Sequence, residues 1–163
     1  MYAHESSPPK ALPPEIRARQ QWMYTLAHAD IADLLPFAAR LKAAGYQFIR
    51  PPEIGMALVR GRMGATGAPF NLGEMTVTRC VVKNDEACVG YSYIAGRDKT
   101  HAELAALADA HLQGARHRSW VCQIIERLDA RRQARQAEAA RRRAGTRVDF
   151  FTLLRGEDPV AGH

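Results

Sequence analysis

The chain has 163 residues, 47% of them hydrophobic, so it is long and apolar enough for one packed domain rather than a disordered chain. Its formal net charge of +6 and its pI of about 9.6 favour acidic partners: nucleic acid, an anionic substrate or an acidic protein surface. No apolar run approaches the roughly 20 residues that cross a bilayer.

The predicted organisation has three parts. Residues 1–14 are a disordered, proline-rich lead-in, residues 15–130 a core domain, and residues 131–163 a basic helical arm with an apolar docking tail. The lead-in carries acids and prolines where a signal peptide needs apolar residues. The three cysteines have no CxxC spacing, which suits reduced thiols better than disulfides. We therefore expect a soluble cytoplasmic protein.

Two helices are expected at the start of the core domain. Pro14 suits the first turn of a helix, because its missing N–H would have no partner there. Asp30 is placed to begin a second helix, in which Pro36 should break or distort the first turn, and Gly45 should end it. The inner face of this second helix is expected to consist of Leu34, Leu35, Ala38 and Leu41.

The middle of the chain predicts an antiparallel sheet of three to five strands covered by helices, so the fold class is α+β. Residues 46–50 are rich in β formers and predict a short strand that Pro51 and Pro52 should end. Three longer strands are expected from alternating patterns, the last two joined as a hairpin, over residues 56–62, 75–83 and 88–96.

A glycine-rich stretch, RMGATGAPFNLGEMTVTRC, begins at Arg62. It lacks the GxxxxGK[ST] pattern and leads into a strand rather than a helix, so it is not a nucleotide-binding P-loop. A connection whose glycines supply positive φ is favoured. The alternative is an anion site formed with another chain from Arg60, Arg62 and the backbone around Gly64 and Gly67.

The segment GRDKTHAE begins a helix and is the stronger candidate for an anion site. Arg97 and Lys99 lie at the helix start, where free N–H groups and the macrodipole favour negative charge. The alternative is ordinary capping by Asp98 or Thr100, with both cations in solvent. His101, one turn into the helix, is a candidate polar contact or proton carrier. His111 is expected to be a packing residue.

The last third predicts a helix that becomes polar on all sides. Trp120, Ile124 and Leu128 share an apolar stripe that ends at Leu128. From Arg116 to Arg147 there are ten arginines against three acids, but no aromatic residues lie among them beyond Leu128. A solvated or partner-facing helix is therefore favoured over a nucleic-acid surface. An apolar cluster with flanking charges follows as a candidate partner-binding tail: Arg147, Asp149, Phe150, Phe151, Leu153, Leu154 and Arg155.

No self-contained catalytic set is visible in the sequence. No His or Cys pair has zinc spacing, so no metal site is expected. Neither Ser92 nor any cysteine lies in a recognisable nucleophile elbow or beside a paired base. We expect no catalytic residue and no cofactor bound by this chain alone.

Four segments in this order and spacing resemble the PhnG family, a small subunit of the bacterial carbon–phosphorus lyase core complex: RQQWMYTLAHAD, RMGATGAPFNLGEMTVTRCVV, GYSYIAGRDKTHAE and TRVDFFTLLRG. The resemblance runs from about Arg19 to Gly156. The chain departs from the family at its proline-rich start, in its basic ARRRAG segment, and at Ala65, where the family usually has another glycine. The departure at Ala65 concerns the fine geometry of that loop.

The resemblance implies work in an assembly with PhnI, PhnH and PhnJ, in a core with two copies of each. That assembly transfers the ribose 5-triphosphate moiety of ATP, used with magnesium, to methylphosphonate and releases adenine. An iron–sulfur cluster with S-adenosylmethionine belongs to PhnJ. No catalytic residue is carried over to this chain. It is then an accessory subunit of that assembly, with self-association possible and neither nucleic acid nor membrane as partner. A basic nucleic-acid-binding module and a pure scaffold without substrate contact remain the alternatives.

Overall fold

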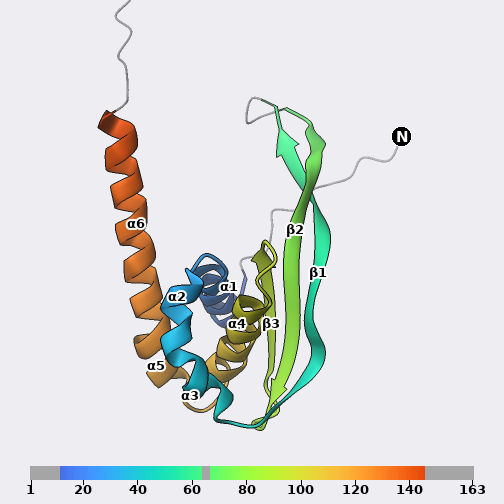
Figure 1. The fold of residues 1–163 in the computed structure, drawn as a ribbon, viewed down its shortest axis with the longest axis vertical. Helices are drawn as coiled ribbons and strands as arrows, with labels where there is room; N and C mark the ends of the chain where they lie inside the picture. The colour runs from blue at the N-terminus through green and yellow to red at the C-terminus, as the bar shows by residue number, and fades with distance from the viewer. Residues whose placement is uncertain (1–11, 64–66, 146–163) are drawn as a thin grey trace, which may run out of the picture.

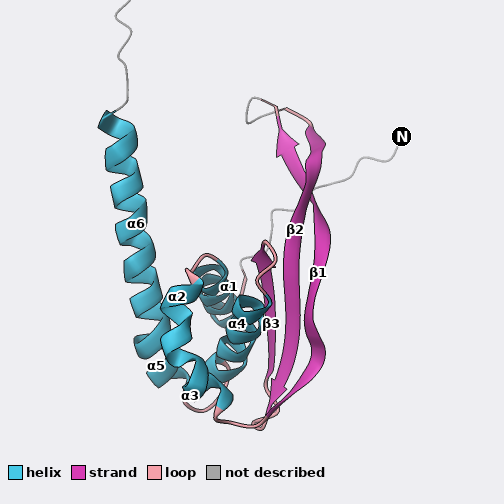
Figure 2. Cartoon of the chain, viewed as in Figure 1, coloured by secondary structure: helices cyan, strands magenta, loops and turns pink. Residues whose placement is uncertain are grey.

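The structure is a computed structural model and describes residues 12–63 and 67–145. It has a three-stranded antiparallel sheet with helices packed on one of its faces (Figure 1 and Figure 2). A two-stranded part of the sheet and the last helix both extend past the other helices, in the same direction (Figure 1). The α+β class and the predicted strand number are confirmed.

Three helices precede the sheet: α1 (Pro14–Ala27), α2 (Ile31–Leu34) and α3 (Ala38–Lys42). Pro14 occupies the first turn of α1, as expected. The side chain of Asp30 caps α2 by accepting a hydrogen bond of 3.0 Å from the amide of Ala32. Pro36 distorts the chain as predicted, because the backbone tightens into a 3₁₀ turn, η1 (Leu35–Phe37), before α3 continues.

Two details of this region were predicted wrongly. Leu35 is 51% exposed, because the 3₁₀ turn rotates it away from the face that buries Leu34 and Leu41 completely. The helix ends at Lys42, and Gly45 instead belongs to the connection into the sheet, where its carbonyl accepts a hydrogen bond of 3.2 Å from the amide of Asp85.

The strands pair antiparallel in the order β1 (Tyr46–Arg62), β2 (Pro69–Asn84) and β3 (Val89–Ala95). The sequence had predicted two strands separated by Pro51 and Pro52, and this was wrong. Because β1 is an edge strand, a proline there removes no obligatory ladder hydrogen bond, and register shifts between Phe48 and Glu53 absorb both residues.

The core lies between the sheet and α4 (Lys99–Leu112). From β2, the side chains of Thr78, Cys80 and Val82 point into it and are fully buried, which confirms the alternation predicted for that strand. Gly90 lets β3 approach the helix closely, since a Cβ there would lie 2.0 Å from the carbonyl oxygen of Ala106.

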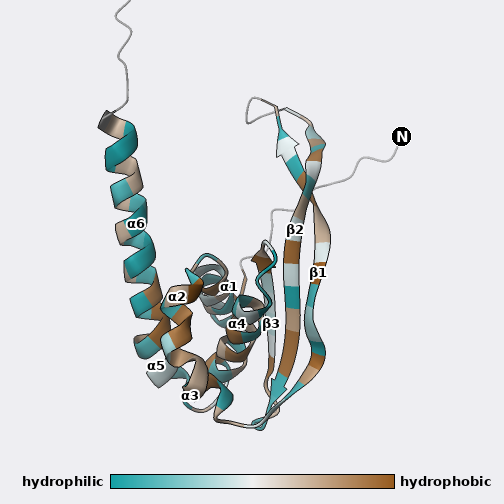
Figure 3. Cartoon of the chain, viewed as in Figure 1, coloured by the Kyte–Doolittle hydropathy of each residue, from teal (hydrophilic) through white to brown (hydrophobic). Residues whose placement is uncertain are grey.

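The chain then continues through α5 (His117–Trp120), a π-helical turn η2 (Val121–Ile125) and α6 (Glu126–Gly145). Trp120, Ile124 and Leu128 are each at most 3% exposed, which confirms the apolar stripe. Beyond them α6 is largely hydrophilic (Figure 3), and the side chains of residues 133–144 are exposed. None of the helices in the described ranges has the length and apolarity needed to span a membrane.

Candidate functional site

The start of α4 carries the two cations of the first candidate anion site. Asp98 lies between them and caps the helix, with its carboxylate accepting a hydrogen bond of 2.8 Å from the amide of His101. Ordinary capping is therefore present, and the cap is Asp98 rather than Thr100. Arg97 and Lys99 are exposed, and neither forms an ion pair or hydrogen bond with another described residue. Contact of these cations with an anion stays a prediction.

The two histidines of α4 contact backbone carbonyl groups of the N-terminal helices. His101 is 6% exposed, and its Nε2 lies 2.9 Å from the carbonyl oxygen of Leu26. His111 is 5% exposed, and its Nε2 lies 3.0 Å from the carbonyl oxygen of Leu41. The packing role predicted for His111 is confirmed. The burial and partner of His101 support a structural role, and its contact with a substrate is untested.

The second candidate anion site lies at the far end of the paired strands β1 and β2. A guanidinium nitrogen of Arg62 is 3.4 Å from the carbonyl oxygen of Gly67, and Arg60 and Arg62 are both exposed. Gly67 is needed for close approach rather than positive φ, because a Cβ there would lie 2.5 Å from the carbonyl oxygen of Met63. Gly64 lies outside the described residues.

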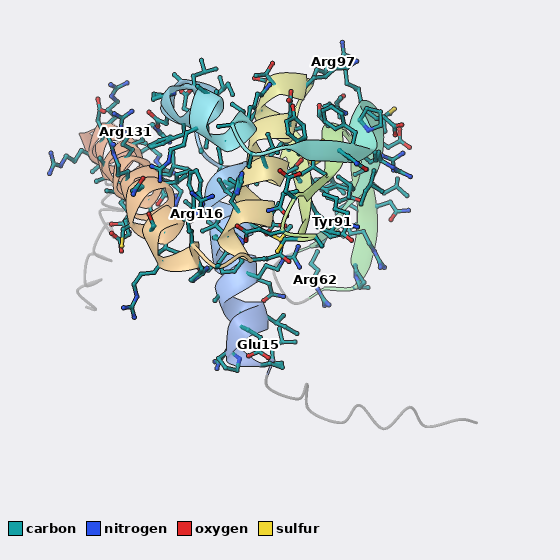
Figure 4. The ribbon with its side chains drawn as sticks, turned by 90° about the horizontal axis from the view of Figure 1, so that it is seen from below. Glu15, Arg62, Tyr91, Arg97, Arg116 and Arg131 are labelled. Atoms are coloured by element: carbon teal, nitrogen blue, oxygen red, sulfur yellow. The ribbon has the colours of Figure 1, made fainter. Side chains whose placement is uncertain are left out.

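The structure does not bring the two groups of cations into one site. Arg97 lines an open hollow of about 480 Å³ whose other walls are Ile54, Gly55, Met56 and Thr76. Arg62 lies six residues beyond Met56 on β1. At about 3.3 Å per residue, this places Arg62 about 20 Å from Met56 and from the hollow that Met56 lines. Figure 4 shows both arginines on the sheet side of the molecule and Arg131 on the side of α6. The hollow therefore offers one cation beside an apolar floor.

The helix-covered face of the sheet continues beyond α4 onto the two-stranded part, which we call the ribbon (residues 54–62 of β1 and 69–76 of β2). Ile54 pairs with Thr78, which is fully buried, so the two lie on this same face. Three large apolar side chains of β1 follow this face outward at 47–68% exposure and form what we call the inner stripe: Ile54, Met56 and Leu58. After a register shift between Val59 and Arg60, Phe70 pairs with Gly61, and a Cβ at Gly61 would contact both Phe70 and Leu72, so these two lie on the opposite face.

Sequence reasoning missed the inner stripe. It found the alternation over residues 56–62 but predicted a sheet with one face covered by helices. The signal that could have found it is the extra strand length, since β1 and β2 have 17 and 16 residues whereas β3 has 7. One helix of 14 residues, about 21 Å long, cannot cover strands of that length.

A buried carboxylate that the sequence did not mark holds three elements together. Asp109 is fully buried on α4 and accepts hydrogen bonds from the guanidinium of Arg19 at 3.2 and 2.7 Å. It also accepts from the indole nitrogen of Trp22 at 2.8 Å and from the backbone amide of Tyr91 at 2.9 Å. A charge so fully paired is typical of a structural role, and this one joins α1, α4 and β3.

The arginines at the base of α6 are paired within the chain. Arg131 and Arg135 both bind the carboxylate of Asp33 on α2, the second at 2.7 Å. The hydrogen bond from Arg135 is the main reason that the pKa of Asp33 lies below its usual range. Arg132 binds Asp129 one turn away at 2.6 Å. These pairs reduce the free positive charge that a nucleic-acid surface would need.

The described ranges contain no group of three or more His, Cys, Asp or Glu side chains placed to hold a metal. The candidate partner-binding tail lies outside the described residues, and its docking stays a prediction; this applies to Arg147, Asp149, Phe150, Phe151, Leu153, Leu154 and Arg155.

In the part of the chain that the structure describes, the buried polar groups hold the fold together while apolar and cationic groups remain exposed. That combination defines a small α+β protein with apolar and cationic surface available to a partner. The family model of the phosphonate metabolism protein PhnG matches residues 17–156, so the chain belongs to the PhnG family.

A relative supports this assignment. The chain is 42% identical over 144 residues to the alpha-D-ribose 1-methylphosphonate 5-triphosphate synthase subunit PhnG of Rhizobium meliloti (strain 1021). The match covers 88% of this chain and 92% of the relative. The resemblance inferred from four sequence segments is therefore confirmed.

Proposed function

We propose that the chain is an accessory subunit of an alpha-D-ribose 1-methylphosphonate 5-triphosphate synthase in phosphonate catabolism. The observation that carries this proposal is the 42% identity to such a subunit over nearly the full length of both chains. In the proposed reaction, an oxygen of methylphosphonate forms a bond to the anomeric carbon of the ribose of ATP. The bond from that carbon to adenine breaks, and adenine leaves.

The contribution of this chain would be to pack against and shape the subunits that hold the reactive groups. Two of its buried polar side chains, Asp109 and His101, are already engaged within the fold. The proposed partners are PhnI, PhnH and PhnJ, two copies of each in the core, in the cytoplasm. ATP with magnesium is the proposed substrate of the complex, and the iron–sulfur cluster with S-adenosylmethionine belongs to another subunit.

Co-expression with the PhnI-type subunit, followed by size-exclusion chromatography, tests the subunit role. We expect the two chains to elute together in one complex that withstands dilution. A chain that elutes as a free monomer in the presence of its proposed partners would contradict the proposal.

Arg97 and Lys99 are proposed to lie near anionic groups of the substrate. The test replaces both with alanine and measures adenine release by the reconstituted complex at several ATP concentrations. We expect a higher KM for the anionic substrate, while alanine at the exposed Arg116 and Arg118 leaves it unchanged. If the first pair of changes has no effect, the pure scaffold alternative is the better description.

A nucleic-acid-binding role is the second candidate, favoured by the net charge of +6. It predicts that the isolated chain binds an oligonucleotide tightly, with affinity falling steeply as salt rises. The ion pairs of Arg131 and Arg135 with Asp33 argue against such a role. Weak binding with a shallow salt dependence would exclude it.

A further inference from the structure

We propose that the inner stripe is the docking surface for one segment of a larger synthase subunit. That segment is apolar on the side that contacts the stripe and carries carboxylates that meet Arg97. The inference rests on the proposed function, because it takes the partner to be a subunit of the same enzyme.

The apolar surface of the ribbon is the first observation. Met56 and Leu58 are 68% and 65% exposed, and they lie on one face of only two paired strands. A two-stranded ribbon is marginal in water, and contiguous exposed apolar surface of this kind marks an interaction site. Covering this face would remove apolar area from water and hold the ribbon in place.

The opposite face of the ribbon is different in character. Beside the inner stripe it presents Gly55 and Ala57 with their partners Val77 and Met75, and Phe70 and Leu72 lie on it nearer the far end of the ribbon. Where the ribbon joins the three-stranded sheet, this outer face carries a charged cluster in which Glu53 contacts Arg79 at 3.5 Å and Arg50 at 3.9 Å. The inner stripe, in contrast, continues the face that the helices cover and borders the hollow of Arg97, so we place the partner there.

Charge at the border of the stripe identifies the kind of partner. Arg97 shares its hollow with Ile54 and Met56 and pairs with no other described residue. Arg60 and Arg62 add two exposed cations further along the ribbon. Carboxylates on the incoming segment would pair with these guanidinium groups and set its register. A second copy of this chain would bring the same cations to the contact, so self-association is disfavoured.

The test compares matched variants in co-expression with the PhnI-type subunit. One variant combines Met56→Asn and Leu58→Asn on the inner face, and the control is Met75→Asn, which changes a 40% exposed methionine on the outer face of the same ribbon. We expect recovery of the complex to fall by about tenfold for the inner pair and to stay near the unaltered level for the control. Since all three side chains are exposed, thermal unfolding of each isolated variant should match the unaltered chain.

Charge reversal supplies an independent readout. Arg97→Glu should weaken the complex, whereas Arg97→Lys should retain most of it and make it more sensitive to salt. If the unaltered chain is recovered in the complex and the inner pair is recovered equally, the docking proposal is overturned while the subunit role stands. If the unaltered chain is not recovered either, both fail.

Two further measurements on the isolated chain distinguish two other occupants of the inner stripe. Protection of residues 54–62 from hydrogen exchange in the isolated chain, lost in a variant that ends at Gly145, would assign the stripe to the chain's own C-terminal segment. A dimer of the isolated chain that the inner pair of substitutions dissociates would assign it to a second copy. Either result would overturn the proposal.

Discussion

At the scale of single residues, Asp33 is the carboxylate that fastens α6 to the N-terminal helices. Its side chain is 8% exposed and accepts hydrogen bonds from Arg131 and Arg135, the second at 2.7 Å. The hydrogen bond from Arg135 keeps the pKa of this carboxyl below 3.8. When folding lowers the pKa of a carboxyl, the charged carboxylate stabilises the fold at any pH above the pKa that the group has in the unfolded chain. This stabilisation is lost as the pH falls through the pKa in the folded chain and the carboxylate is protonated.

Asp33→Asn should therefore lower the free energy of unfolding at pH 7 by about 1–2 kcal/mol, since both partners are partly exposed. Below pH 3.8 the difference from the unaltered chain should shrink, because the unaltered side chain also becomes neutral. Urea unfolding at a series of pH values measures this difference. The exposed pair of Glu138 with Arg142 provides the control, and Glu138→Gln should change stability by less than about 0.5 kcal/mol. A difference that does not vary with pH would exclude the charge as its cause.

The three cysteines should react with thiol reagents at very different rates. Burial raises the pKa of Cys80 to about 11, so this residue stays a thiol in the core, whereas Cys122 is exposed. An aromatic disulfide reagent at pH 8 should modify Cys122 first, Cys88 more slowly, and Cys80 only after unfolding. Cys122→Ser should remove the fast phase. Equal rates for all three cysteines in the folded chain would contradict the placement of β2.

Sequence reasoning at this scale succeeded where the partner is close in the chain and failed where it is distant. Asp30 was correctly assigned as a helix cap, because its partner lies two residues away. The buried pairing of Asp109 with Arg19 joins residues 90 positions apart, and that of His101 with Leu26 joins residues 75 apart. No local pattern marks such pairs, so the structural use of these side chains became visible only in the fold.

At the scale of elements, the contact between β3 and α4 depends on the absence of a side chain at Gly90. A Cβ there would meet backbone atoms of both Ala106 and Ala110, at 2.0 and 2.6 Å. Neither backbone atom can move without displacing the helix from the sheet. This close contact carries much of the core, because α4 supplies more buried apolar residues than any other described helix.

Gly90→Ala should lower the free energy of unfolding by about 2–3 kcal/mol, as expected for overpacking a rigid contact. Gly73→Ala is the matched control on β2, since a Cβ there meets nothing within 4 Å, and it should leave stability unchanged or slightly higher. Chemical denaturation of both variants makes the comparison. If the two variants are equally stable, the close contact between β3 at Gly90 and α4 is not rigid.

The types of the elements were largely predictable, and their lengths were not. Alternating and helical spacing identified β2, β3, α4 and the stripe that leads into α6. The prolines at positions 51 and 52 were taken to end a strand, although β1 continues through them because it lies at the edge of the sheet. A strand's place in its sheet depends on tertiary pairing, which the local pattern does not contain.

At the scale of the whole molecule, the ribbon and α6 extend past the helical layer in the same direction (Figure 1). The sequence indicated a basic surface and a missing catalytic set, and four quoted segments indicated the family that residues 17–156 match. The inner stripe could not be predicted in the same way, because its exposure depends on how far α4 reaches along the sheet. We expect this uncovered surface to make the chain dependent on larger subunits.

The sharpest test of the subunit role is adenine release from ATP in the presence of methylphosphonate and magnesium. We expect no release by this chain alone, little by the other synthase subunits without it, and full release when they are combined. Release by the purified chain alone would rule out an accessory role, and so would full activity of the other subunits in its absence.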